Sequence, residues 1–131
     1  MKAIVFGGSG FIGSHVADHL SSSGYETTIF DLEESKWLRK NQKMIIGDIM
    51  NYDQVNKSIK GSDVVYNFAG LSDLEIGLEN PILSYNSNVL GNINIMNSCC
   101  EHNIKRFIYA STVYVHSREG GFYRCSKEAS E

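Results

Sequence analysis

A short apolar segment at the start of the chain runs directly into a glycine-rich loop. Residues 2–6 form the apolar segment, and the loop follows as Gly7-Gly-Ser-Gly10-Phe-Ile-Gly13, with the spacing G-x-x-G-x-x-G. Gly7 permits a tight turn at a strand end, Gly10 lets a pyrophosphate approach the backbone, and Gly13 lets the next helix pack closely. The free N–H groups and dipole of that helix then bind the anion.

A glycine-rich turn is common, so the loop alone is weak evidence. Here an apolar strand precedes it and an amphipathic segment, Ser14–Leu20, follows it. This context is what the motif requires, and it predicts a dinucleotide-binding site.

Composition limits the other classes of partner. The chain has 131 residues, a net charge of -3 and 42% hydrophobic residues, which predicts one domain with its own core. Nothing in this charge favours nucleic acid or an anionic membrane, and no apolar run is long enough to span a bilayer. We therefore expect neither partner.

The potential metal ligands do not form a recognisable site. The three cysteines, Cys99, Cys100 and Cys125, contain no C-x-x-C spacing, which predicts reduced structural thiols in a cytoplasmic protein. His15 and His19 share a helix face but have no third ligand nearby, so no metal is expected.

Apolar runs alternate with helical patterns along the chain, which predicts βαβα units and a parallel sheet. Strands are expected at Lys2–Phe6, Glu26–Phe30, Lys43–Ile46, Asp63–Phe68 and Arg106–Ala110, and helices at Phe11–Ser22, Tyr52–Lys60 and Pro81–His102. Residues 33–42 form either a short helix or a loop. Right-handed crossovers give a doubly wound α/β sheet of the Rossmann type with strand order 3-2-1-4-5, and the nucleotide lies across its carboxyl edge.

Asp31 ends the second predicted strand, 24 residues after Gly7. A carboxylate at this position can accept hydrogen bonds from the adenosine ribose hydroxyls. It would also repel a 2′-phosphate, and the following Leu32-Glu-Glu34 supplies no arginine to bind one. Asp31 therefore favours NAD over NADP.

Two further segments follow strand ends at the same edge. Asp48 could bind the adenine amino group while Ile49 covers the ring, although a plain turn before the next helix is equally compatible with Asp48. The small residues of Phe68-Ala69-Gly70 allow a ribose and phosphates to approach the backbone, and a tight turn explains them as well.

Tyr123 and Lys127 are four residues apart, so they share one face of a predicted helix. A neighbouring cation stabilises a phenolate, which makes Tyr123 a usable general base. A lone Y-x-x-x-K usually marks a solvated helix face. Here it follows a glycine-loop sheet and a strand ending in Ser111-Thr112, and this combination predicts a catalytic site.

The sequence resembles the extended short-chain dehydrogenase/reductase family, specifically its NAD-dependent sugar-nucleotide epimerase/dehydratase branch, and within it the UDP-galactose 4-epimerase-like members. The resemblance extends along the whole chain. The matching runs are Gly7-Gly-Ser-Gly10-Phe-Ile-Gly13, Asp31, Gly47-Asp48-Ile49, Asn67-Phe-Ala-Gly70, Asn88-Val-Leu-Gly91 after Pro81 and Tyr85, Phe107-Ile-Tyr-Ala-Ser-Thr112, and Tyr123 to Lys127.

This resemblance implies hydride chemistry at a sugar carbon. Tyr123 would take the proton of a sugar hydroxyl, Thr112 would hydrogen-bond that oxygen, and Lys127 would bind the nicotinamide ribose. Phe11 and Ile12 would join the cofactor-binding residues, together with Tyr123 and Lys127. NAD would accept the hydride, and an epimerase would return it to the opposite face of the sugar. Asn88 would belong to the helix that supports the active site, and a purely structural role for Asn88 is the alternative.

The chain also departs from the family pattern. Dehydratases and decarboxylases usually carry acidic residues after the catalytic threonine or serine, whereas Val113 and Tyr114 follow Thr112 here. This argues against both activities. The alignment after this strand leaves Ser111 as an alternative to Thr112.

The chain ends at Glu131, early in the predicted Tyr123 helix. Family members continue with two further strands and a small domain that binds the nucleotide diphosphate. We therefore expect residues 1–131 to be an incomplete NAD-binding domain, truncated before the C-terminal substrate domain, from an enzyme that acts on a nucleotide-sugar. A homodimer through Pro81–His102 is a possible assembly. The alternatives are a keto-sugar reductase or dehydrogenase of the same family and a non-catalytic dinucleotide-binding module.

Overall fold

A five-stranded parallel sheet forms the centre of the computed structural model, which describes residues 1–131. The strands are β1 (Lys2–Phe6), β2 (Glu26–Asp31), β3 (Gln42–Ile46), β4 (Val64–Asn67) and β5 (Arg106–Tyr109). Their order is β3-β2-β1-β4-β5, and every neighbouring pair is parallel. The predicted fold class and strand order are confirmed.

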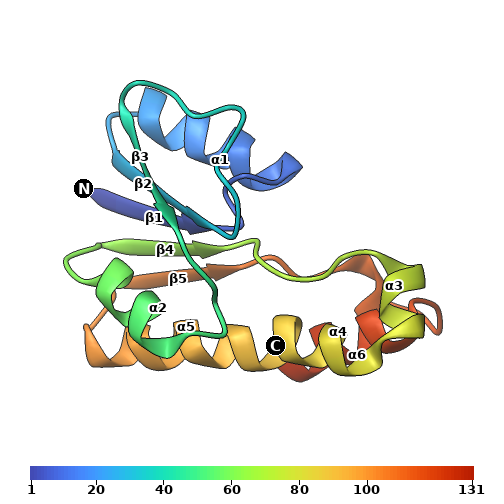
Figure 1. Ribbon diagram of the computed structural model, residues 1–131. Helices are drawn as coiled ribbons and strands as arrows, with labels where there is room; N and C mark the ends of the chain where they lie inside the picture. Colours follow the sequence, from blue (N-terminus) through green and yellow to red (C-terminus); the bar gives the residue numbers. More distant parts are fainter.

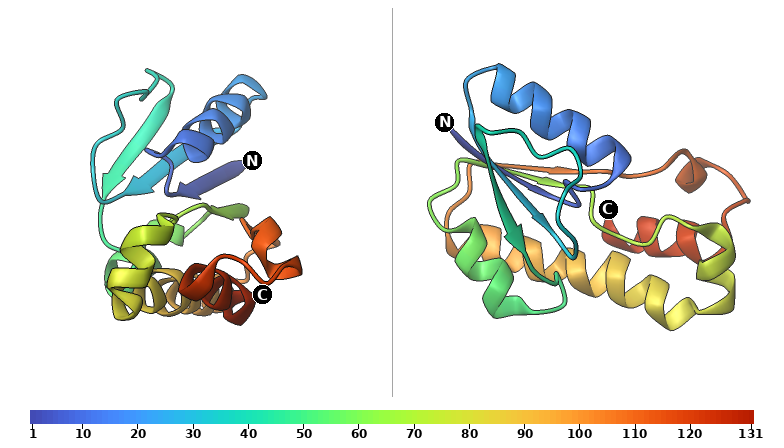
Figure 2. Two further views of the ribbon diagram at one scale, coloured as in Figure 1. Left: turned by 90° about the vertical axis from the view of Figure 1, so that its right-hand side faces the viewer. Right: turned by 45° about the horizontal axis from the view of Figure 1, so that its top comes forward.

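Helices lie on both faces of this sheet (Figure 1). One face carries α1 (Phe11–Ser22), and the other carries α2 (Tyr52–Ile59) and α5 (Gly91–Glu101), as the turned views in Figure 2 also show. No helix is both long and apolar enough to cross a membrane.

Alternation within β1 explains how the sheet buries both faces. Ile4 and Phe6 belong to the core beneath α2 and α5, whereas Ala3 and Val5 belong to the core beneath α1. The Phe6 ring packs on that of Phe30, with centroids 4.8 Å apart. Burying a large apolar side chain contributes about 1.5–3 kcal/mol, so the sheet is anchored on each side.

The predicted long helix from Pro81 consists of three joined segments. These are α4 (Pro81–Tyr85), the π-helical turn η1 (Asn86–Leu90) and α5, which ends at Glu101, one residue before the predicted end. Asn80 caps the start, because its side chain accepts a hydrogen bond from the Leu83 N–H. The π turn, which the sequence did not predict, is a local distortion that often occurs at functional sites.

Three further elements lie toward the carboxyl edge. The short α3 (Leu74–Glu79) was not predicted, although Asp73 caps it through the N–H groups of Glu75 and Ile76. The 3-10 turn η2 (Val113–His116) leads to α6 (Gly121–Ser130), which packs beside α4 and η1 (Figure 2). Residues 32–41 form a loop, which settles the alternative left open by the sequence.

Candidate cofactor-binding and catalytic site

The glycine loop is packed so tightly that side chains do not fit at two of its positions. Gly7 has a positive φ of 73°, and a Cβ there would lie 2.5 Å from the backbone nitrogen of Ala69. A Cβ on Gly13 would lie 2.1 Å from the Gly7 carbonyl oxygen. The structure thus brings the predicted loop at β1 against the predicted segment after β4.

Gly10, by contrast, faces open space. A Cβ built on it would meet only the Gly7 carbonyl oxygen, at 3.4 Å. Gly10 is also the N-cap of α1, where no side chain caps the helix and the first turn carries no acidic residue. The first-turn N–H groups are therefore left for an anion, which is the chemistry that a dinucleotide pyrophosphate requires. Phe11 and Ile12, in the same turn, are exposed.

Asp31 lies directly beside the glycine loop. Its Oδ2 accepts a hydrogen bond from the Ser9 N–H at 2.9 Å, and its Oδ1 accepts one from the Leu32 N–H at 2.8 Å. The Ser9 hydroxyl in turn donates to the Glu33 carbonyl at 2.8 Å. Each carboxylate oxygen retains a lone pair, so this half-buried group can still accept bonds from ribose hydroxyls.

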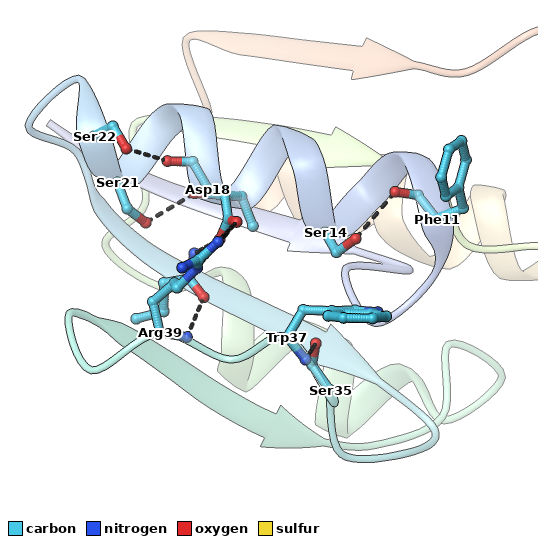
Figure 3. Close-up of polar contacts among 10 residues, drawn as sticks. Phe11, Ser14, Asp18, Ser21, Ser22, Ser35, Trp37 and Arg39 are labelled. Carbon is cyan, nitrogen blue, oxygen red and sulfur yellow. Dashed lines mark hydrogen bonds and ion pairs between the residues drawn. The ribbon is translucent and has the colours of Figure 1, made fainter.

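The loop after β2 is fastened to α1 by a charged cluster (Figure 3). Arg39 donates to both carboxylate oxygens of Asp18, with the shortest contact at 2.8 Å, and Gln42 donates to the same carboxylate at 2.9 Å. The Arg39 hydrogen bond is the main reason why the pKa of Asp18 is lowered. The exposed Trp37 belongs to this loop, where its backbone N–H donates to the Ser35 hydroxyl (Figure 3).

Asp48 and Ile49 follow β3, as predicted. The Asp48 side chain is exposed and accepts a local hydrogen bond from the Met50 N–H at 2.8 Å, whereas Asn51 is the cap of α2. Ile49 packs against α5 at Gly91. Its Cδ1 atom lies so close that a Cβ on Gly91 would be only 2.4 Å away. The exposed Asp48 carboxylate remains available to a ligand, and the adenine contact stays a prediction.

Asn88 joins the segment after β4 to α6. Its side-chain oxygen accepts the Leu71 N–H at 2.7 Å, and its amide nitrogen donates to the Leu71 carbonyl at 3.0 Å and to the Ser126 hydroxyl at 2.8 Å. Gly70 has a φ of 152°, and a Cβ on it would lie 2.5 Å from the Asn88 side-chain oxygen. The fully buried Asn88 therefore ties Gly70-Leu71 to the helix that carries Tyr123 and Lys127.

A second buried amide pair, absent from the sequence predictions, supports the same region. Asn67 at the end of β4 donates to the Asn92 side chain at 2.8 Å, and its own oxygen accepts the Ala69 N–H at 3.0 Å. Asn92 also donates to the Ser130 carbonyl at 3.3 Å. The position of Asn67 after an apolar strand was visible in the sequence, but its partner lies on a helix 25 residues away.

Lys127 is buried, with only 6% of its surface exposed. Its ammonium donates to the Ala110 carbonyl at 2.9 Å and lies 4.7 Å from the centroid of the Tyr109 ring and 5.8 Å from that of Tyr123. Burial lowers the pKa of Lys127 to about 8, because desolvation penalises the charged form. The structure thus brings the predicted pair together at the end of β5.

The two candidate hydroxyls after β5 have different partners. Ser111 donates to the Glu131 carboxylate, whereas the Thr112 hydroxyl oxygen accepts only a 3.4 Å hydrogen bond from the Tyr114 N–H. The Tyr114 ring packs edge-on against Tyr123, with centroids 6.2 Å apart. Thr112 therefore precedes a turn that contacts the Tyr123 helix and keeps its own proton free to donate.

The sheet has this parallel strand order, and a glycine loop after its first strand leads into a helix without a side-chain cap. These features define a dinucleotide-binding domain of the Rossmann type. The profile of the NAD dependent epimerase/dehydratase family matches residues 3–129. The chain belongs to this family.

The chain is similar to three proteins in particular. The bifunctional UDP-glucose 4-epimerase and UDP-xylose 4-epimerase 1 of Pisum sativum is 30% identical over 89% of this chain and 38% of its own. The UDP-glucose 4-epimerase of Klebsiella pneumoniae is 30% identical over 88% of this chain and 92% of its own. A crystal structure of UDP-galactose 4-epimerase superimposes with a TM-score of 0.90 at 26% identity, covering 100% of this chain and 49% of its own. The chain thus spans less than half of the pea enzyme and of the crystallised epimerase.

Proposed function

We propose that this domain binds NAD across the carboxyl edge of its sheet and belongs to a nucleotide-sugar epimerase-type oxidoreductase. The observation that carries the proposal is the buried Lys127 ammonium beside Tyr123. It lies in the same domain as a glycine loop that leads into a helix without a side-chain cap. Neither feature alone distinguishes an enzyme from a structural domain. Together they provide a cofactor site and a proton-transfer group.

The residues around the loop suit NAD. The open backbone at Gly10, with the N–H groups of Phe11 and Ile12, suits the pyrophosphate, and Gly7 and Gly13 hold that backbone in place. Asp31 suits the adenosine ribose, and Asp48 with Ile49 would face the adenine. Phe68, Ala69 and Gly70 would lie along the other half of the cofactor. Bound NAD supplies the hydride acceptor.

The reaction itself falls to the residues at the end of β5 and on α6. Tyr123 accepts the proton of a sugar hydroxyl, and the carbon that bears this hydroxyl gives up its hydride to the acceptor. The alcohol thereby becomes a ketone. Thr112 donates a hydrogen bond to that oxygen, and the Lys127 ammonium stabilises negative charge on Tyr123. Tyr123 would then return the proton to the same oxygen when the ketone is reduced on its opposite face, which gives the epimer.

A one-way dehydrogenase is the second candidate, because nothing in the Tyr123–Lys127 geometry requires the hydride to return. The two functions differ in their products. An epimerase converts UDP-glucose to UDP-galactose without net release of NADH, whereas a dehydrogenase releases one NADH for each sugar oxidised. A dehydratase is disfavoured, because the exposed residue after Thr112 is Val113 and not the acidic residue that dehydratases usually have there.

Because residues 1–131 alone are expected to be catalytically incomplete, the test is product analysis with NAD, UDP-glucose and a version of this domain that includes the C-terminal substrate domain expected from the family. We expect UDP-galactose with no accumulation of NADH, and no product from Tyr123→Phe. Stoichiometric NADH would support the dehydrogenase instead. Tight NAD binding without turnover of any nucleotide-sugar would support a non-catalytic module.

We also propose that the protein forms a homodimer through Pro81–His102. This helix exposes Ile82, Leu83 and Leu90, and Phe122 is exposed on the neighbouring α6. Exposed apolar side chains on two helices that pack together are typical of protein interfaces. Sedimentation equilibrium of the wild type and of Ile82→Glu measures this association.

A further inference from the structure

The buried Lys127 ammonium has few polar partners. It forms no ion pair, and its single hydrogen bond goes to the Ala110 carbonyl at 2.9 Å. An ammonium has three N–H donors, so two remain after this bond. A buried charge without an acidic partner is costly, and another favourable contact is needed to keep it in place.

Tyr109, the last residue of β5, provides such a contact. Its ring centroid lies 4.7 Å from Lys127 Nζ, closer than the Tyr123 ring at 5.8 Å. Both distances fall within the range of a cation–π interaction. The Tyr109 hydroxyl is buried and has no hydrogen-bond partner, so the ring face is the part of this side chain that engages Lys127.

We propose that Tyr109 is a positioning residue, whose ring face and the adjacent Ala110 carbonyl together hold the Lys127 ammonium beside Tyr123. Tyr109 and Ala110 are neighbours at one strand end, so both anchors are fixed by the sheet rather than by a mobile loop. The third N–H of the ammonium is then left for a ligand. That catalytic consequence rests on the proposed function, but the contact itself does not.

The charged groups nearby have other partners. Glu128, on the same helix as Lys127, lies 3.5 Å from the Arg124 guanidinium, and Glu131 accepts the Ser111 hydroxyl. The side chains that face the ammonium at close range are those of Tyr109 and Tyr123. The ring quadrupole of Tyr109 and the Ala110 carbonyl are therefore the two features that favour the charged ammonium at this place.

The test keeps the shape of residue 109 and changes only its ring electronics. Tyr109→Phe retains the ring face, and phenylalanines with one, two or three fluorine atoms at this position progressively weaken the cation–π interaction. The Lys127 pKa is measured by NMR of ¹³C-labelled lysine in the purified protein, without NAD or sugar. Tyr66→Leu, on the neighbouring strand and in the core under α1, is the control.

We expect Tyr109→Phe and Tyr66→Leu to leave the Lys127 pKa close to that of the wild type. The fluorinated series should lower it stepwise, by about 0.5–1.5 pH units in total, because the charged form loses the ring's stabilisation. A constant or rising pKa across the series overturns the proposal, as does a full decrease in Tyr109→Phe. Failure of the proposed reaction would appear in product analysis and leave this titration unaffected.

Discussion

Asn88 on the π turn forms two hydrogen bonds to the backbone of Leu71, accepting its N–H at 2.7 Å and donating to its carbonyl at 3.0 Å. A strand neighbour would satisfy both groups in the same way, but Leu71 lies beyond the end of β4. The third contact of Asn88, to Ser126, extends this link to α6. One amide therefore fixes the cofactor-side segment relative to the proposed catalytic helix.

Asn88→Ala should destabilise the protein strongly. The substitution leaves the Leu71 N–H and carbonyl without their partner, and each unsatisfied group costs about 1–3 kcal/mol. The Ser126 oxygen also loses a donor, although its hydroxyl still donates to the Tyr123 carbonyl. Urea unfolding should show a loss of at least about 2 kcal/mol. Asn97→Ala, at an exposed position of the same helix, is the control and should change stability by less than about 0.5 kcal/mol. Equal effects of the two substitutions would argue against the Asn88 link.

Gly10→Ala should separate folding from cofactor binding. The added Cβ meets only the Gly7 carbonyl oxygen at 3.4 Å and φ is -75°, so the free protein should retain its stability. Calorimetry should nevertheless show a loss of NAD affinity of tenfold or more (about 1.4 kcal/mol), because the Cβ occupies the space where the pyrophosphate approaches. Wild-type affinity in this variant would place the pyrophosphate elsewhere.

The protein should prefer NAD to NADP. The Asp31 carboxylate, fixed by the N–H groups of Ser9 and Leu32, repels a 2′-phosphate. Asp31→Ala should narrow the difference between the two dissociation constants, whereas Glu34→Ala, an exposed acidic residue of the same loop, should leave it unchanged. Equal or tighter binding of NADP to the wild type would contradict the role of Asp31.

Stability should depend on the ionisation of Lys127 in mildly alkaline solution. The pKa of this group falls from 10.5 in the unfolded chain to about 8 in the folded protein. Between these values the unfolded chain binds more protons, so Lys127 contributes stability that rises with pH above about 8 and is lost as the pH falls through that value. Subtracting the unfolding free energies of Lys127→Met from those of the wild type, from pH 7.5 to 9.5, isolates this contribution. A flat difference would mean that the ammonium is not desolvated.

Local patterns account for much of this structure. The continuous apolar run of residues 3–6 predicted β1, and the helix predicted from Pro81 does begin there, where Asn80 caps it. These features depend on nearest neighbours in the chain. The six-residue α3 was not predicted, because it is too short to show a helical period.

The remaining features depend on contacts between distant segments. Asn88 reaches Ser126 across 38 residues, and its environment exists only because α6 packs on the π turn. The spacing of Tyr123 and Lys127 predicted that the two share a helix face. It did not predict that Lys127 turns inward to the Ala110 carbonyl, because that orientation is set by the end of β5.

The central claim is that Tyr123 transfers the substrate proton while NAD binds independently of it. The direct measurement compares kcat and the NAD dissociation constant of Tyr123→Phe with those of the wild type, both in a version that includes the expected substrate domain, using a nucleotide-sugar substrate. Removing a general base lowers kcat by about 10²–10⁴-fold, and we predict this loss with NAD affinity unchanged within about twofold. A near-normal kcat in Tyr123→Phe would contradict the account.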